Sequence, residues 1–346
     1  MRRHDQALRV TTPPRLTHLS RGTLWSKNPA MHRLIVQLLI AISVLSQETT
    51  IRTTVPLVTI PVEVTDVHGN PIEGISATDF VLLDNGLPRP VSVDVLESGI
   101  SPISLVAVVQ TSDMSLAAVA KIKKIGSMIP LAVVGANGSA ALVTYDAEVK
   151  LVQPFTTDAD AISEAFSGLK ASVARSGHML DALDRALDLL AAQSGGHRRN
   201  ILIIGEAKDR GSKAKLETIV QKLQRTGTTV YAMNYSKMLT PFTTKADEFE
   251  PTGDYLQGMI ELARLAKRNT MSTLTEMTGG KRFGFETKAG LERDLMLLSK
   301  DIHNRYLLSF TPAVEQTSSF HKIDVQVQNA PGAITRARPG YWSTTQ

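Results

Sequence analysis

The side chains best placed for chemistry directly follow an apolar run. Residues 103–109 (Ile-Ser-Leu-Val-Ala-Val-Val) predict a buried strand, and the next four residues are Gln110, Thr111, Ser112 and Asp113. A helix is predicted soon after them. In open α/β sheets, ligands bind in the crevice at the carboxyl ends of the strands. These polar side chains are therefore candidates for a binding edge.

A nucleophilic site is one alternative at the same edge. Ser112, His178 and Asp181 are all predicted on loops or helix starts there, so they could form a Ser-His-Asp triad. No Gly-x-Ser-x-Gly elbow and no evident oxyanion hole accompany them. A hydrolase is therefore the weaker hypothesis, and His178 is expected to take part in starting a helix instead.

The elements that would position these side chains alternate between strands and helices over residues 101–303. This alternation predicts a mostly parallel sheet with helices on both faces. Strands are predicted at 103–109, 139–145, 148–152, 200–205, 228–233 and 281–285. Helices are predicted at 116–134, 158–169, 179–193, 212–226, 258–277 and 288–303. Only Asp146 and Ala147 join the second strand to the third, so that pair must be antiparallel.

Two β units flank this α/β unit, at residues 55–99 and 304–342. Residues 58–67 alternate partly between apolar and polar side chains, as a half-buried strand does, and Asp84-Asn85-Gly86 predicts a hairpin turn. The two β units could close into one β-sandwich-like unit, with the α/β domain inserted between them.

The amino-terminal segment has the features of a secretory signal peptide. Residues 31–46 combine Arg33 with a short apolar stretch, Leu34 to Leu45, and small residues near its end. About 20 apolar residues are needed to span a membrane, so no stable transmembrane anchor is expected after cleavage. Residues 1–30 are predicted to be disordered or to reflect a mis-assigned start. Export to the periplasm or secretion is compatible with the absence of cysteine.

The net charge of the chain is concentrated in this leader. The first 50 residues hold seven Lys or Arg and two acidic residues, which accounts for the whole formal charge of +5. The other 31 basic and 31 acidic residues balance each other. The folded part therefore lacks the general basic excess that is typical of nucleic-acid binding.

Six short motifs occur in order along residues 55–342. They are Val62–Gly69, Asp79–Gly86, Phe155–Asp158, Asp181–Leu187, Tyr306–Pro312 and Arg336–Tyr341. Together they resemble the acidobacterial von Willebrand factor type A (VWFA)-related family. The resemblance implies a Rossmann-like α/β domain, with a mostly parallel sheet and one antiparallel edge strand. It also implies export and protein–protein binding rather than catalysis.

The resemblance also implies a metal-ion-dependent adhesion site, whose ligands come from three loops. In the first loop Gln110 stands where the family has aspartate, Ser112 is kept, and Met114 replaces a serine. Mg²⁺ and Mn²⁺ prefer hard oxygen ligands that include a carboxylate. The neutral amide and the thioether therefore weaken this part of the site.

The other two loops differ from the family as well. The family's threonine falls at Gly177 or His178, and its Ser-Asp-Gly becomes Gly205-Glu206-Ala207. Glycine offers no ligand, whereas Glu206 keeps the charge on a longer side chain. The site is therefore expected to be degenerate. Gln110, Ser112 and Glu206 are the residues that would have to bind Mg²⁺ or Mn²⁺, and no cofactor is expected.

Taken together, the sequence predicts an exported, non-enzymatic module that binds an unidentified protein partner without strong metal dependence. The predicted binding rim comprises Gln110, Thr111, Ser112, Asp113, Gly177, His178 and Glu206. A metal-dependent adhesion module and a hydrolase at the same rim are the two alternatives.

Overall fold

The computed structural model describes residues 57–94, 102–112, 116–193, 196–234, 255–284, 288–313 and 319–343. All of these residues belong to one compact unit, Val55–Gln346. The predicted leader (residues 1–30 and 31–46), Asp113 and Met114 lie outside the described residues. No helix in the described ranges is long and apolar enough to cross a membrane.

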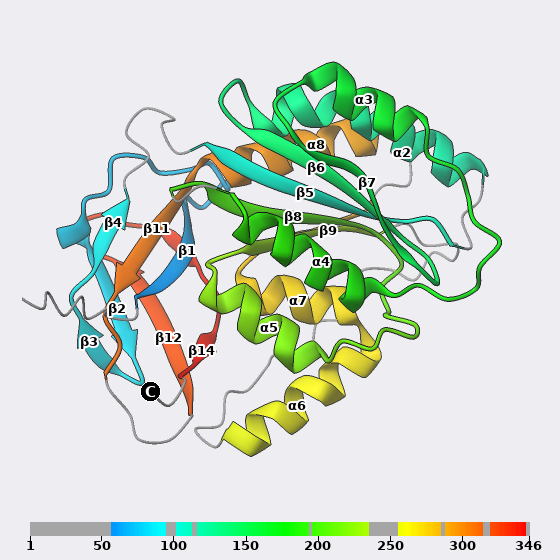
Figure 1. The fold of residues 1–346 in the computed structure, drawn as a ribbon. Helices are drawn as coiled ribbons and strands as arrows, with labels where there is room; N and C mark the ends of the chain where they lie inside the picture. The colour runs from blue at the N-terminus through cyan, green and yellow to red at the C-terminus, as the bar shows by residue number, and fades with distance from the viewer. Residues whose placement is uncertain are drawn as a thin grey trace, which may run out of the picture. The chain divides into compact units, whose positions relative to one another are not determined.

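A six-stranded sheet forms the centre of the unit (Figure 1). Its strands, in spatial order, are β10 (Arg282–Gly284), β9 (Thr229–Asn234), β8 (Arg198–Gly205), β5 (Ile103–Gln110), β6 (Ser139–Tyr145) and β7 (Val149–Thr156). Neighbouring strands are parallel except for β6 and β7, which pair antiparallel at the edge. The predicted α/β class, with one antiparallel edge strand, is confirmed.

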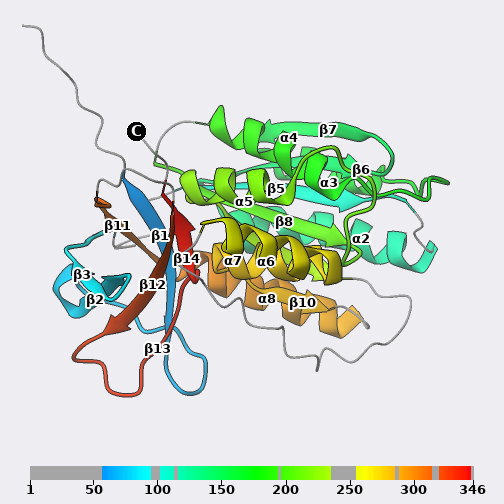
Figure 2. The same cartoon turned by 90° about the horizontal axis from the view of Figure 1, so that it is seen from below.

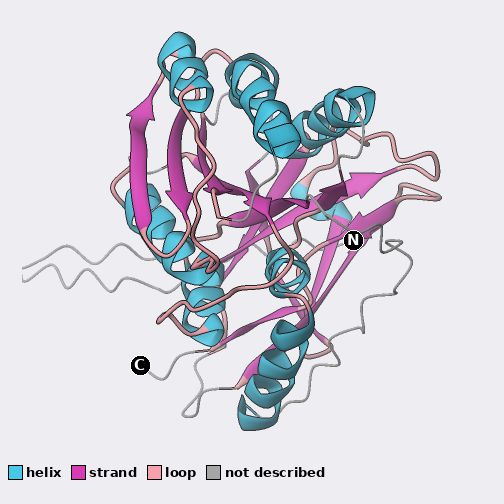
Figure 3. Cartoon of the chain, turned by 90° about the vertical axis from the view of Figure 1, so that its right-hand side faces the viewer, coloured by secondary structure: helices cyan, strands magenta, loops and turns pink. Residues whose placement is uncertain are grey.

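Helices cover both faces of this sheet because alternate strand residues are apolar on both sides. In β5, Leu105 and Ala107 belong to one core, together with α2 (Leu116–Met128), α3 (Ala159–Ser167) and α8 (Lys288–His303). Val106 and Val108 belong to the opposite core, with α4 (Met179–Ala191), α5 (Leu216–Arg225) and α7 (Thr270–Thr278). Figure 3 shows helices on two sides of the strands. A strand buried on both faces has the near-continuous apolar sequence seen at 103–109.

Three of the predicted helices are wrong in extent. The helix predicted at 212–226 is α5, which begins only at Leu216. The helix predicted at 116–134 is α2, which ends at Met128, followed by a π-helical segment Ile129–Val134 that contains Pro130. The helix predicted at 258–277 is two helices, α6 (Tyr255–Arg268) and α7. Asn269 separates them because its backbone is extended and its side chain accepts a hydrogen bond from the Ser272 N–H at 2.8 Å. Asparagine favours such helix starts.

Two four-stranded sheets form the flanking β-sandwich (Figure 2). One sheet has the order β13 (Ile334–Arg336), β1 (Val58–Thr65), β11 (Arg305–Phe310) and β4 (Ser92–Asp94). The other has the order β14 (Gly340–Trp342), β12 (Phe320–Val327), β2 (Phe80–Asp84) and β3 (Leu87–Arg89). Each sheet thus combines strands from both ends of the described chain, and a shared apolar core lies between them. The sandwich-like unit expected from the sequence is present.

The hairpin predicted from Asp84-Asn85-Gly86 is also present. Asn85 and Gly86 have φ values of 51° and 80°, and Asp84 pairs with Leu87. A two-residue hairpin loop needs positive φ at both residues so that its twist matches that of the flanking strands. Asn and Gly adopt positive φ most readily, which explains the Asn-Gly pair.

Candidate functional site

Gln110 lies at the centre of the predicted rim, at the carboxyl end of β5. Its side chain is 3% exposed. Its Oε1 accepts hydrogen bonds from the Glu206 N–H at 2.8 Å and from Tyr145 Oη at 3.4 Å. Its Nε2 donates to Ser112 Oγ at 3.0 Å. Because a backbone N–H can only donate, the bond from Glu206 fixes which end of the amide is oxygen. The Gln110 amide therefore joins two other residues of the predicted rim, Ser112 and Glu206.

Two glycines leave the space that this amide occupies. A Cβ atom on Gly177 would lie 3.2 Å from Gln110 Nε2 and 3.5 Å from Ser112 Oγ. A Cβ atom on Gly205 would lie 2.8 Å from Gln110 Oε1 and 2.5 Å from Tyr145 Oη. A contact below 3 Å forces neighbouring atoms to move, so a side chain at position 205 conflicts with the observed arrangement of Gln110, whereas one at position 177 would require only a small shift of the amide.

Backbone hydrogen bonds hold the surrounding loops to one another. Gly177 and Arg210 exchange two of them, at 3.2 and 3.0 Å. Thr111 donates its N–H to the Tyr145 carbonyl at 2.9 Å and accepts at its own carbonyl from the Ser172 N–H at 2.8 Å. The rim thus consists of four loops fastened side by side, and the structure brings Gln110, Thr111, Ser112, Gly177 and Glu206 into one neighbourhood.

The start of α4 is capped by residues that the sequence did not single out. Ser212 Oγ accepts hydrogen bonds from the N–H groups of Leu180 and Asp181, at 3.0 and 3.2 Å. Asp209 Oδ1 accepts from Leu180 as well, at 3.1 Å. His178 occupies the N-cap position, but its side chain makes no capping bond. His178 therefore takes part in starting this helix through its backbone, and the side-chain capping comes from Ser212 and Asp209, which are typical capping residue types.

The acidic residues of the rim also have partners within the protein. Asp181 accepts hydrogen bonds from the N–H groups of Lys213 and Ala214, at 3.0 and 2.8 Å. Glu206 forms an ion pair with Arg210 at 3.1 Å. Burial raises the pKa of Asp146, but hydrogen bonds from Glu148, Ser172 and Thr111 and the charge of Lys150 outweigh it, so that pKa lies below its ordinary value. These carboxylates are used to order the loops.

The predicted metal ligands do not fit a divalent cation in this arrangement. Gln110 points an amide N–H at Ser112 Oγ, where a cation would need a free oxygen lone pair. Gly177 has no side chain, and Glu206 is paired with Arg210. Among the described residues, no group of three or more His, Cys, Asp or Glu side chains is placed to hold a metal ion.

The residues of the hypothetical triad at the rim are not arranged as a triad. Ser112 is 1% exposed and its hydroxyl is hydrogen-bonded to Gln110. His178 Nδ1 lies 3.8 Å from Asp181 Oδ2, which is too long for a hydrogen bond. The geometry therefore gives no support to a nucleophilic Ser112.

A Ser-His-Asp chain does occur in the β-sandwich, where no sequence motif indicates one. Asp84 Oδ1 lies 2.6 Å from His321 Nδ1, and His321 Nε2 lies 3.1 Å from Ser319 Oγ. Asp84 and His321 are buried, and the Ser319 N–H donates to Ser343 Oγ at 2.9 Å rather than pointing to an open site. We interpret this chain as a structural link between β2, β12 and β14.

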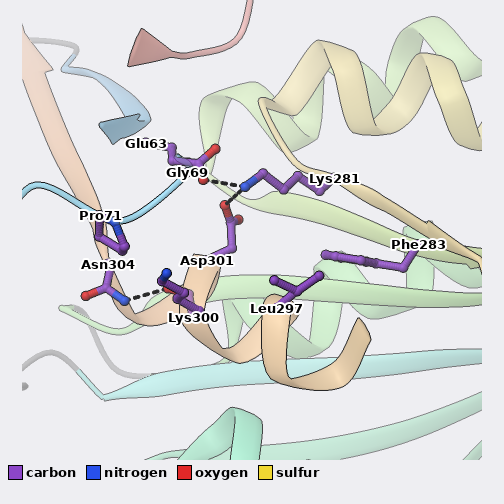
Figure 4. Close-up of a pocket in the computed structure, with 9 residues that line it drawn as sticks. All are labelled: Glu63, Gly69, Pro71, Lys281, Phe283, Leu297, Lys300, Asp301 and Asn304. Atoms are coloured by element: carbon purple, nitrogen blue, oxygen red, sulfur yellow. Dashed lines mark hydrogen bonds and ion pairs between the residues drawn. The ribbon is translucent and has the colours of Figure 1, made fainter. Parts of the chain in front are cut away.

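A small pocket of about 100 Å³ lies between the sandwich and the α/β domain (Figure 4). It is lined by Glu63, Gly69, Pro71, Lys281, Phe283, Leu297, Lys300, Asp301 and Asn304. Lys281 forms ion pairs with Glu63 and, at 2.9 Å, with Asp301. Asp301 is also paired with Arg305 at 2.7 Å. These ion pairs join the sandwich to the α/β domain. Because the charged side chains are paired with one another, the pocket offers no evident ligand site.

No protein-family model matches the sequence, and no curated protein matches it. Solved structures show a likeness of fold. A von Willebrand factor type A protein from Catenulispora acidiphila is 11% identical, over 84% of this chain and 75% of that chain, with a TM-score of 0.43.

Two further solved structures show a comparable likeness. Proximal thread matrix protein 1 of the mussel byssus, solved with a zinc-occupied MIDAS motif, is 13% identical over 61% of this chain, with a TM-score of 0.42. This chain spans 48% of that protein's length. An aerotolerance-related membrane protein from Bacteroides fragilis is 12% identical over 58% of this chain and 98% of that chain, with a TM-score of 0.39. The structures similar to this chain thus include von Willebrand factor A domains.

Proposed function

We propose that this protein is an exported interaction module that binds another protein at the carboxyl edge of its central sheet without a bound cation. The observation that carries the proposal is the position of Gln110. Its amide joins the loops that follow β5 and β8, through Ser112 and Glu206. Membership of the acidobacterial VWFA-related family and the cleaved signal peptide at residues 31–46 form part of the same proposal.

The hydrogen bonds of the Gln110 amide explain how the rim is ordered without a metal ion. A divalent cation orders neighbouring loops by drawing their oxygen atoms around one charge. Gln110 orders the same loops with neutral hydrogen bonds, which need neither a buried carboxylate nor a cation to balance it. Loops that are already ordered lose less conformational freedom when a partner binds, so the rim is preorganised for binding.

Two other functions remain weaker candidates. Metal-dependent adhesion would need Gln110, Ser112 and Glu206 to bind Mg²⁺ or Mn²⁺ through intervening waters, after the present hydrogen bonds had broken. Hydrolysis would need Ser112 to become exposed and to meet a base. Neither candidate is favoured by a specific contact.

The cysteine-free sequence allows a direct test, because one engineered cysteine can be modified selectively. Val173 lies fully exposed on the loop before α4 and Leu131 is 82% exposed before β6, at the opposite edge of the sheet. We would prepare Val173→Cys and Leu131→Cys, attach a bulky polyethylene glycol maleimide to each, and use both full chains as bait for envelope proteins in EDTA.

The proposal predicts a partner that both unmodified variants retain in EDTA and that only the Val173-modified bait loses. Loss of the partner in EDTA, with recovery in Mg²⁺, would favour metal-dependent adhesion instead. Equal retention by both modified baits would place the binding face elsewhere on the molecule.

A further inference from the structure

We infer that the partner presents an acidic segment to this edge, which is recognised by exposed Lys and Arg side chains of two loops. This inference rests on the proposed function and adds the chemistry of the partner. The two loops are residues 168–178, before α4, and residues 206–215, before α5. They lie side by side through the Gly177–Arg210 backbone bonds, at one edge of the sheet (Figure 1).

The two loops are rich in exposed cations. They hold six Lys or Arg and only two acidic residues, although the chain beyond residue 50 is balanced in charge. The six are all exposed: Lys170, Arg175, Lys208, Arg210, Lys213 and Lys215. Arg210 is paired with Glu206, whereas the other five form no ion pair with any described residue. Positive charge is thus concentrated where the partner is proposed to bind.

The two acidic residues of these loops face inward. Glu206 has a side chain that is 20% exposed and is held by Arg210. Asp209 accepts hydrogen bonds from Ser212 Oγ at 2.6 Å and from the Leu180 N–H at 3.1 Å. Because Asp209 accepts from donors within the protein and Glu206 is paired with Arg210, the remaining outward-facing charge of the two loops is mainly positive. Complementary charge on the partner would speed association and exclude basic partners.

An acidic protein segment fits this surface better than a nucleic acid does. The described residues of the two loops include no Phe, Tyr or Trp side chain on which bases could stack. Val173, which is fully exposed, lies between Lys170 and Arg175 and offers apolar contact of the kind found in protein interfaces. The chain beyond residue 50 has no overall positive charge, which non-specific nucleic-acid binding would use.

The test uses the full chain and three fluorescein-labelled probes: deca-glutamate, deca-glutamine and a mixed-sequence single-stranded DNA. Binding is followed by fluorescence anisotropy from about 50 to about 300 mM NaCl, since screening weakens contacts between exposed charges. We expect deca-glutamate to bind, to weaken about tenfold over this range of salt, and to bind more tightly than both other probes.

Charge reversal supplies the matched comparison. The rim variant Lys208→Glu/Lys213→Glu/Lys215→Glu should bind deca-glutamate at least about tenfold more weakly. The control variant Lys124→Glu/Arg282→Glu/Lys322→Glu changes the net charge equally at exposed sites on α2, β10 and β12, and should stay within about twofold of the wild type. All six positions are exposed, so both variants should fold, which urea unfolding checks.

Several outcomes would overturn the inference: no binding of deca-glutamate, equal losses in the rim and control variants, or tighter binding of the DNA. If deca-glutamate fails to bind while modification at Val173 still blocks capture of the partner, the proposed function stands and its partner is not acidic. If modification at Val173 has no effect on capture, the proposed function itself fails.

Discussion

The Gln110 side chain and the absence of a side chain at Gly177 depend on each other. A Cβ atom at position 177 would lie 3.2 Å from Gln110 Nε2, closer than most Cβ contacts in proteins. A Cβ atom at position 205 would likewise lie close to Gln110, at 2.8 Å from its Oε1. Positions 110, 177 and 205 are therefore linked by packing: the Gln110 side chain occupies space that a side chain at either glycine would crowd.

The first prediction concerns this packing. Gly205→Ala should destabilise the protein by about 1–3 kcal/mol, because the new methyl group would overlap Tyr145 Oη and Gln110 Oε1. Gln110→Ala should cost a similar amount, about 1–3 kcal/mol, because the buried Glu206 N–H loses its acceptor. Urea unfolding of the full chain measures both free energies.

The double variant tests whether the two residues are coupled. Removing the Gln110 amide also removes one of the two atoms that the alanine at position 205 would overlap. The cost of Gln110→Ala/Gly205→Ala should therefore be smaller than the sum of the single costs by about 0.5 kcal/mol or more. Strict additivity would show that Gly205 does not constrain Gln110.

The second prediction concerns metal binding. The wild-type melting temperature should not respond to Mg²⁺ at about 10 mM. In Gln110→Asp/Met114→Ser/Gly177→Thr, three oxygen ligands of the family pattern return together, and Mg²⁺ should stabilise the protein. Binding at about 100 times the dissociation constant corresponds to about 2.7 kcal/mol of stabilisation. Thermal melts in Mg²⁺ and in EDTA make the comparison.

The single variant Gln110→Asp is the control for this experiment. Its carboxylate would be buried without the cation or the other ligands, so it should be less stable than the wild type in EDTA and should gain little from Mg²⁺. A wild-type melting temperature that rises in Mg²⁺ would contradict the proposed metal independence directly.

The third prediction concerns the charges between the sandwich and the α/β domain. Asp301 is 4% exposed and is paired with Arg305 and Lys281. Asp301→Asn would leave the buried Arg305 guanidinium without its counter-charge, at a cost of about 3–5 kcal/mol. Glu261→Gln, which breaks the surface pair with Arg264, should cost less than about 1 kcal/mol. Similar costs in urea unfolding would contradict the structural role of Asp301.

The same residue predicts a pH dependence. Burial raises the pKa of Asp301, but the charges of Arg305 and Lys281 outweigh it and lower that pKa from 3.8 to about 2. A carboxyl group whose pKa is lower in the folded state stabilises the protein above about pH 4 and loses this contribution as the pH falls towards 2. The free energy of unfolding should therefore fall less steeply with acid in Asp301→Asn than in the wild type. Identical slopes would argue against the pairing.

The fourth prediction concerns the polar chain inside the sandwich. His321→Ala removes the 2.6 Å hydrogen bond to the buried Asp84 and leaves a cavity, so it should cost about 2–4 kcal/mol. Lys322→Ala, at the exposed neighbouring position, should change stability by no more than about 0.5 kcal/mol. A cost of His321→Ala below about 1 kcal/mol would contradict a structural role for the Asp84–His321 pair.

The architecture of the described chain could be predicted because it depends on local patterns. The apolar run before Gln110 is typical of a strand buried on both faces, and the short connection between Tyr145 and Val149 can only reverse the chain. Asn85 and Gly86 specify their hairpin in the same local way. The α6–α7 break was missed because Asn269 acts as a helix cap only once its side chain reaches the Ser272 N–H, within an otherwise helical apolar pattern.

The candidate site likewise has features that the sequence predicts and features that only the tertiary structure shows. Residue types alone determined that position 110 carries an amide rather than a carboxylate, and that Gly177 offers no ligand. Only the tertiary structure decided how Gln110 is bonded, because the Glu206 N–H and Ser112 Oγ reach it from loops that the sheet brings together. The capping of α4 by Ser212, the Asp84–His321–Ser319 chain and the Asp301 pairs likewise join residues distant in sequence. Hydrogen bonds and ion pairs act over a few ångströms in space, so residue order along the chain does not reveal them.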